Sequence, residues 1–98
     1  MCNSGNLEWD ERKNQLNQQK HGFSFAAASQ VFDDPNVLYE EDRTEEGEQR
    51  WHAIGLLQSA ILLVVYCYRE YENGKETIRI VSARAASTHE IRRYFAQR

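Results

Sequence analysis

The sequence predicts an α+β fold with two N-terminal helices, an antiparallel sheet of about four strands and one C-terminal helix. Helix-capping residues and helical apolar spacing dominate the chain up to Pro35, its only proline. After Pro35, β-branched and aromatic segments alternate with turn residues. A chain of 98 residues is long enough for one core, so we expect a single domain over residues 1–98.

Polar residues precede the first helix, and residues 1–7 are expected to form a loose tail. Asp10 is placed to cap a helix over residues 11–20, and Gly22 to end it. Ser24 is placed to cap a second, short helix. The apolar positions of that helix follow helical spacing and are Phe25, Ala28, Val31 and Phe32.

Four segments have strand character. Residues 37–41 are short and are expected at an edge of the sheet, and residues 49–57 follow as the second strand. Residues 60–69 are apolar on both faces, which predicts a central strand. Asn73-Gly74 indicates a hairpin turn before the last strand, residues 77–84.

The chain ends in a predicted helix over residues 88–96, capped by Ser87, with Ile91, Tyr94 and Phe95 on its packed side. Charge is unevenly distributed before and within it. Residues 36–50 contain six acids and two bases, whereas residues 75–98 contain six bases and two acids. A solvated surface and a surface for nucleic acid or an acidic partner both fit this asymmetry.

Several function classes are disfavoured. Cys2 and Cys67 form no Cys-x-x-Cys pair, which argues against a thiolate zinc site and for reduced thiols. The longest apolar run, residues 60–67, is too short to cross a bilayer, so we expect a cytoplasmic protein that binds no membrane. No metal or cofactor is expected, because paired ligand spacing is missing from the histidines, which are His21, His52 and His89.

Arginines on the predicted strands are the candidate chemical groups. Arginine stays charged and is costly on a strand in a small core, so Arg79 and Arg84 together suggest contact with an anion such as phosphate. Arg50 and Arg69 lie on neighbouring predicted strands. Regular alternation places Arg79 and Arg84 on opposite faces unless a bulge intervenes, and surface ion pairing is the alternative for all four arginines.

Other candidates follow from spacing. Glu48, Arg50 and His52 alternate along one strand and therefore share a side. The helical spacing of Lys13, Asn17 and Lys20 gives either a basic rim over the sheet or a solvated face. Aromatic residues leave two alternatives, since strand aromatics usually pack in the core but can also stack on bases. These strand aromatics are Trp51 and Tyr66.

Five blocks of sequence between Leu7 and Tyr94 resemble the BrnT family of bacterial toxins. The blocks occur in the family's order: 8–14 with Asn17 and 20–25; 31–35; 48–50 with 54–55; 64–66 with Arg69; and 78–85 with Glu90 and Tyr94. The resemblance implies a small RelE-like ribonuclease, with helices packed on a curved antiparallel sheet. It also implies a BrnA-like antitoxin with a ribbon-helix-helix domain, through which alone DNA would be contacted.

The resemblance and the candidate residues together predict cleavage of messenger RNA without a metal. Attack by the RNA's own 2′-hydroxyl needs in-line orientation, proton transfer and neutralisation of developing charge. The expected catalytic residues are Glu48, Arg50, Arg69 and Arg84. The expected RNA-binding residues are Lys13, His52, Arg79 and Arg93.

The chain also departs from the family pattern, with Ser59-Ala60 before the central strand and Thr44-Glu45 ahead of the Glu48-x-Arg50 block. A second function therefore stays open: a catalytically inactive module that binds the antitoxin within a DNA-binding repressor complex.

Overall fold

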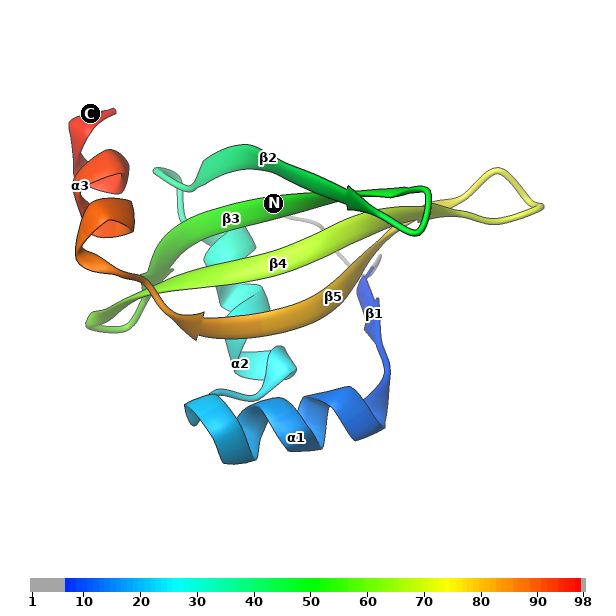
Figure 1. Ribbon diagram of the computed structural model, residues 1–98, viewed down its shortest axis with the longest axis horizontal. Helices are drawn as coiled ribbons and strands as arrows, with labels where there is room; N and C mark the ends of the chain where they lie inside the picture. Colours follow the sequence, from blue (N-terminus) through cyan, green and yellow to red (C-terminus); the bar gives the residue numbers. More distant parts are fainter. Residues whose placement is uncertain (1–6, 98) are drawn as a thin grey trace.

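The computed structural model describes residues 7–97, which form one five-stranded sheet with the strand order β1-β5-β4-β3-β2 (Figure 1). The strands are β1 (Leu7–Trp9), β2 (Leu38–Glu45), β3 (Glu48–Leu57), β4 (Ala60–Glu70) and β5 (Glu76–Ala85). The helices are α1 (Glu11–His21), α2 (Phe25–Ala28), the 3-10 helix η1 (Ser29–Asp33) and α3 (Thr88–Ala96). Within residues 7–97, no helix is long and apolar enough to cross a membrane.

The predicted α+β class is confirmed, but the predicted strand number, sheet type and element order are wrong. A strand precedes the first helix, and it pairs in parallel with β5, so the sheet is mixed. Leu7 therefore belongs to a strand and not to a loose tail, opposite Ile78, with Trp9 opposite Ile80. Residues 1–6 lie outside the described part of the chain. Three residues are too few for strand periodicity to show in the sequence.

The other elements lie close to their predicted positions. Asp10, Ser24 and Ser87 cap α1, α2 and α3, and Gly22 ends α1 with a left-handed backbone. β4 is the central strand, as predicted. β2 is an edge strand but extends beyond its predicted end to Glu45, because a bulge between Glu41 and Thr44 lets it keep pairing with β3.

The main core lies between the sheet and the segment α2–η1. Phe25, Ala28, Val31 and Phe32 are buried there, which confirms the predicted apolar stripe. Gly55 permits this close packing, because an added Cβ would lie 2.7 Å from Val31 Cγ1. A smaller cluster of Ile54, Leu63 and Tyr94 joins α3 to one end of the opposite face of the sheet. Phe95, predicted to pack, is 50% exposed.

α1 is a polar helix that docks through an asparagine. Asn17 accepts a hydrogen bond from the Ala83 backbone N–H at 3.1 Å and donates to the Ala83 carbonyl at 2.9 Å. It also donates to the Phe23 carbonyl at 2.9 Å. The Asn17 amide thus forms with Ala83 of β5 the pair of hydrogen bonds that a neighbouring strand would form. Asn17 is only 7% exposed.

We expect Asn17→Ala to destabilise the protein strongly. The substitution leaves a buried N–H and two buried carbonyls without partners, which costs roughly 2–4 kcal/mol. Urea denaturation would measure this loss, with exposed Gln18→Ala on the same helix as the control. A loss under about 0.5 kcal/mol, typical of surface sites, would contradict the proposed role of Asn17.

Candidate functional site

A bulge in β5 brings its two arginines to the same face of the sheet. Arg79 pairs with Cys67 and Arg84 with Leu63. Between them, the register shifts at β4 residues Val65 and Tyr66, so that β5 has one extra residue at this point. Regular alternation would point the two arginines to opposite faces, and this bulge is the exception that the sequence analysis left open.

Besides Arg84, five of the predicted site residues lie on this face, which we call the charged face. Three come from β3, one from β4 and one from β5: Glu48, Arg50, His52, Arg69 and Arg79. β3 alternates as expected, since Trp51 and Ala53 pack in the main core and the residues that alternate with them face the other way. Arg69 Nε donates to Glu48 Oε2 at 2.8 Å, which joins β4 to β3.

Arg79 is also held by a carboxylate. Its Nη1 donates to Glu8 Oε2 at 2.6 Å across the parallel pair β1–β5. The Tyr71 hydroxyl also bonds to Glu8 and, together with Arg79, lowers the pKa of that carboxyl against the effect of burial. Cys67 lies among these charged groups, where burial and Glu48 raise the pKa of its thiol. Arg69 and Arg79 are thus each paired with a carboxylate.

Arg50 differs from the other arginines of the charged face. Its side chain is 18% exposed, and its Nε is buried without a hydrogen-bond partner among the described residues. The guanidinium Nη2 lies 4.0 Å from Glu45 Oε1. A buried donor without an acceptor is costly, so an anion bound here would gain a hydrogen bond that the protein leaves unmade.

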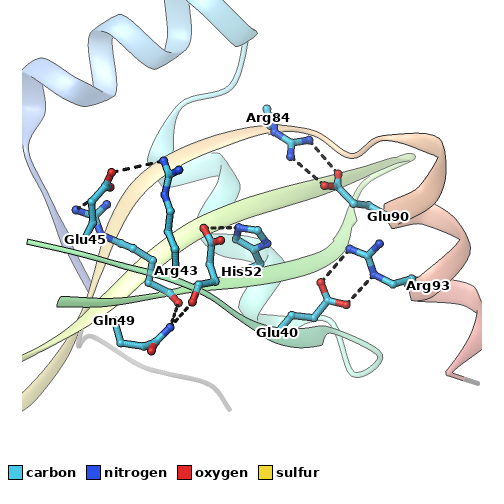
Figure 2. Close-up of polar contacts among 10 residues, drawn as sticks. Glu40, Arg43, Glu45, Gln49, His52, Arg84, Glu90 and Arg93 are labelled. Atoms are coloured by element: carbon cyan, nitrogen blue, oxygen red, sulfur yellow. Dashed lines mark hydrogen bonds and ion pairs between the residues drawn. The ribbon is translucent and has the colours of Figure 1, made fainter. Parts of the chain in front are cut away.

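His52 is oriented by Asp42 on the neighbouring strand. The imidazole Nε2 lies 2.9 Å from Asp42 Oδ2 (Figure 2). The Arg43 backbone N–H and His52 lower the pKa of the Asp42 carboxyl, although burial opposes them. An ionised carboxylate in contact with one ring nitrogen fixes the orientation of the imidazole. The other ring nitrogen is then the one left for contact with a ligand.

Arg84 and Arg93 make two-pronged ion pairs that hold α3 (Figure 2). Arg84 donates to both Glu90 oxygens at 2.9 Å, and Arg93 donates to both Glu40 oxygens at 2.8 and 3.0 Å. Arg84 lies four positions along β4 from the row of Arg79, or roughly 13 Å. The structure therefore places these two predicted site residues at α3, apart from the cluster on the charged face.

Lys13 also lies apart from the charged face. It borders a groove between α1 and the bulged part of β5, together with Lys20 and the apolar Leu16. Asn17 lies in the same groove but is buried against Ala83, so the predicted row of three does not form a uniform basic rim. The structure thus does not bring Lys13 together with the candidate arginines.

Sequence reasoning missed Glu8 and Asp42 as members of the site. Each becomes a partner only through strand pairing, Glu8 through parallel β1–β5 and Asp42 through β2–β3. The bulge after Glu41 further obscures which side of β2 Asp42 occupies. Among residues 7–97, no three acidic, histidine or cysteine side chains come together as a metal-binding group.

Comparison with known families identifies the family of the chain. Residues 9–90 match the family described as the ribonuclease toxin, BrnT, of type II toxin-antitoxin systems. The chain belongs to the BrnT family. The match covers every strand of the charged face. No curated protein sequence matches the chain.

Membership in the BrnT family implies a ribonuclease toxin and an antitoxin partner. Several residues of the resemblance blocks serve the fold of this toxin. Asn17 pairs with Ala83, and Gly55 admits Val31. Asp34 Oδ2 accepts hydrogen bonds from the Leu56 N–H at 2.8 Å and from the Tyr94 hydroxyl at 2.5 Å. The two contacts of Asp34 join the end of η1 to β3 and to α3.

The Arg84–Glu90 pair should make the stability of the toxin pH-dependent. Arg84 lowers the pKa of Glu90 from 4.5 to about 2, helped by Ser87 and opposed by burial. Because the folded pKa is the lower one, the stabilisation is complete above about pH 4.5 and disappears as the pH falls towards 2. Allowing for the 40% exposed Arg84 side chain, we expect roughly 1–3 kcal/mol.

Denaturant unfolding of the toxin and of Glu90→Gln between pH 2 and pH 7 would measure this contribution. The stability difference should be largest at neutral pH and shrink towards pH 2. The exposed Glu46→Gln, in the β2–β3 turn, is the control. A difference that is constant over the whole range would rule out a contribution from the Glu90 charge.

Proposed function

We propose that this BrnT-family toxin is an endoribonuclease that cleaves messenger RNA in the cytoplasm without a metal ion. RNA would lie across the charged face, in a RelE-like arrangement with α2 and η1 behind the sheet and α3 at one end of the charged face. One observation supports this most directly: the buried Nε of Arg50 has no acceptor among residues 7–97, on a face where Arg69 and Arg79 lie on the next two strands of the sheet. A phosphate oxygen is an acceptor that suits a guanidinium.

In this mechanism, Arg50 binds the scissile phosphate and stabilises the charge that develops on it. Arg69 is 43% exposed and can turn from Glu48 towards a phosphate, whereas Arg79 stays with Glu8 and adds positive potential. The free energy needed to break the ion pair between Arg69 and Glu48 is subtracted from the free energy of RNA binding. In return, the Glu48 carboxylate becomes free when the substrate binds.

Proton transfer is assigned to His52 and Glu48, which lie on the same strand and the same side as Arg50. Histidine exchanges protons near neutral pH and serves as both base and acid. Asp42 keeps the ring oriented, and it stabilises the imidazolium that forms when His52 takes the proton of the 2′-hydroxyl. The imidazolium then gives this proton to the leaving oxygen, while the Glu48 carboxylate, released by Arg69, assists the first transfer by accepting a hydrogen bond from the 2′-hydroxyl.

The partner that neutralises the toxin is proposed to be a BrnA-like antitoxin with a ribbon-helix-helix domain, so that DNA is contacted only through it. A second function is favoured by the pairing of most arginines with carboxylates, which weakens the attraction for RNA. In that case the chain is an inactive antitoxin-binding module of a repressor complex. Growth arrest when the toxin is expressed alone supports the enzyme, and unimpaired growth supports the module.

Arg50→Ala should lower the rate of RNA cleavage by about 10²–10³-fold, because it removes the donor aimed at the phosphate. The assay uses purified toxin, an RNA substrate and excess chelator. Arg12→Ala removes an exposed arginine from α1 and is the control for lost charge. Equal cleavage by the wild type and Arg50→Ala would reject the assigned role, and a requirement for magnesium would reject the mechanism.

His52→Gln should lower the cleavage rate by about 10²-fold and remove the pH dependence that a histidine base produces between pH 5 and 8. Asp42→Asn should reduce the rate less, because the imidazole remains but loses its oriented partner. Rates measured across this pH range test both. A His52→Gln variant within twofold of the wild type at every pH would show that another group moves the proton.

A further inference from the structure

A ladder of aromatic rings runs from the main core to the surface, on the face of the sheet opposite the charged face. Phe32 and Tyr66 are buried at its inner end, with ring centroids 5.2 Å apart. Tyr68 lies 5.7 Å from Tyr66, and Trp51 lies 6.1 Å from Tyr68. Tyr39 stacks on Phe32 at 6.5 Å. We call Tyr39, Trp51 and Tyr68 the aromatic patch.

The aromatic patch faces solvent. Tyr39 is 49% exposed and Tyr68 is 43% exposed, while Trp51 is half-buried. The two hairpins β2–β3 and β4–β5 extend beyond the helices (Figure 1). A solvated sheet face normally contains polar side chains at such positions. Clustered, exposed tyrosine and tryptophan indicate a binding surface, because these residues are enriched in the centres of protein interfaces.

Acidic side chains border the aromatic patch. Glu41 lies directly opposite Trp51 in the β2–β3 register, and directly opposed residues share a face. Glu70 lies two positions from Tyr68 on β4 and opposite Glu76 on β5. Burial, Tyr68 and the charge of Asp33 together raise the pKa of the Tyr39 hydroxyl. Asp33 is therefore the fourth acidic neighbour of the patch.

We propose that the aromatic patch and its four acidic neighbours dock a cationic segment of the antitoxin, an inference that rests on the toxin-antitoxin function proposed above. Arginine and lysine stems pack on tyrosine and tryptophan faces while their charged ends meet carboxylates. RNA does not fit here, because its phosphates would be repelled by Asp33, Glu41, Glu70 and Glu76. The sheet thus separates the surface for RNA from the surface for this segment.

The test compares antitoxin binding with RNA cleavage. The Tyr39→Ser/Tyr68→Ser variant should bind the purified cognate antitoxin about 30-fold or more weakly. Its RNA cleavage without antitoxin should stay within about twofold of the wild type. Leu16→Ser is the control, because Leu16 is 58% exposed on α1 and outside the patch. Thermal unfolding verifies that each variant is folded.

A charge variant tests the proposal independently of the rings. Glu41→Gln/Glu70→Gln should slow association with the antitoxin about 3–10-fold at low salt, and the difference should shrink as salt is raised. Gln15→Lys/Gln18→Lys on α1 changes the net charge by the same amount and should leave association unslowed.

Unchanged antitoxin affinity in both patch variants would overturn the proposal. Weaker RNA binding with unchanged antitoxin affinity would overturn it too, and would assign the patch to nucleic acid. The proposed ribonuclease activity is rejected by a different result, namely a wild-type protein that binds antitoxin but does not cleave RNA. The comparison of antitoxin binding between variants would still be valid in that case.

Discussion

The extra residue in β5 determines which face of the sheet every side chain of that strand occupies. Before the bulge, Ile78 and Ile80 point into the main core, and after it Ala83 does the same. A regular strand would place Ala83 on the opposite side from Ile80. The bulge therefore lets both halves of β5 contribute to one core, and as a consequence it moves Arg79 and Arg84 to the same opposite face.

α1 is attached to β5 just beyond the point where β1 ends. β1 pairs with β5 only as far as Ile80, which leaves the backbone groups of Ala83 beyond the end of β1. The side chain of Asn17 takes the place of a strand there. Apolar burial contributes little to holding α1 against the sheet, because Leu16, its only large apolar residue, is 58% exposed. The hydrogen bonds of Asn17 supply the contact instead.

Electrostatics on the charged face depend on pairs formed between distant parts of the chain. The acidic segment 36–50 and the basic segment 75–98 meet through Glu40 and Arg93, so their opposite net charges partly cancel within the fold. Arg69 and Arg79 are likewise compensated by Glu48 and Glu8. Arginines held by carboxylates are preorganised but attract RNA less. Among residues 7–97 the buried Nε of Arg50 has no acceptor, so an anion bound there would gain a hydrogen bond.

Local signals predicted the local structure well. Caps at Asp10 and Ser87 lie where the sequence indicated, and alternation correctly grouped Glu48 with Arg50. Features that depend on pairing between distant segments were missed, namely β1, the bulge in β5 and the contact of Asp42 with His52. A strand pairing is a property of two segments, and neither segment's own residue pattern contains it.

Arg84 shows why site residues are harder to predict than elements. Its position at the end of a strand fits contact with phosphate, but Glu90 is six residues further on and is aimed back at it by the cap of α3. The pair then holds α3, with help from Tyr94 and Asp34. Arg84 forms an ion pair with Glu90 within the fold and therefore positions a helix. The Nε of Arg50 has no acceptor among the described residues and is therefore available to a ligand. The difference between these two roles depends on the carboxylate partner and not on the arginine itself.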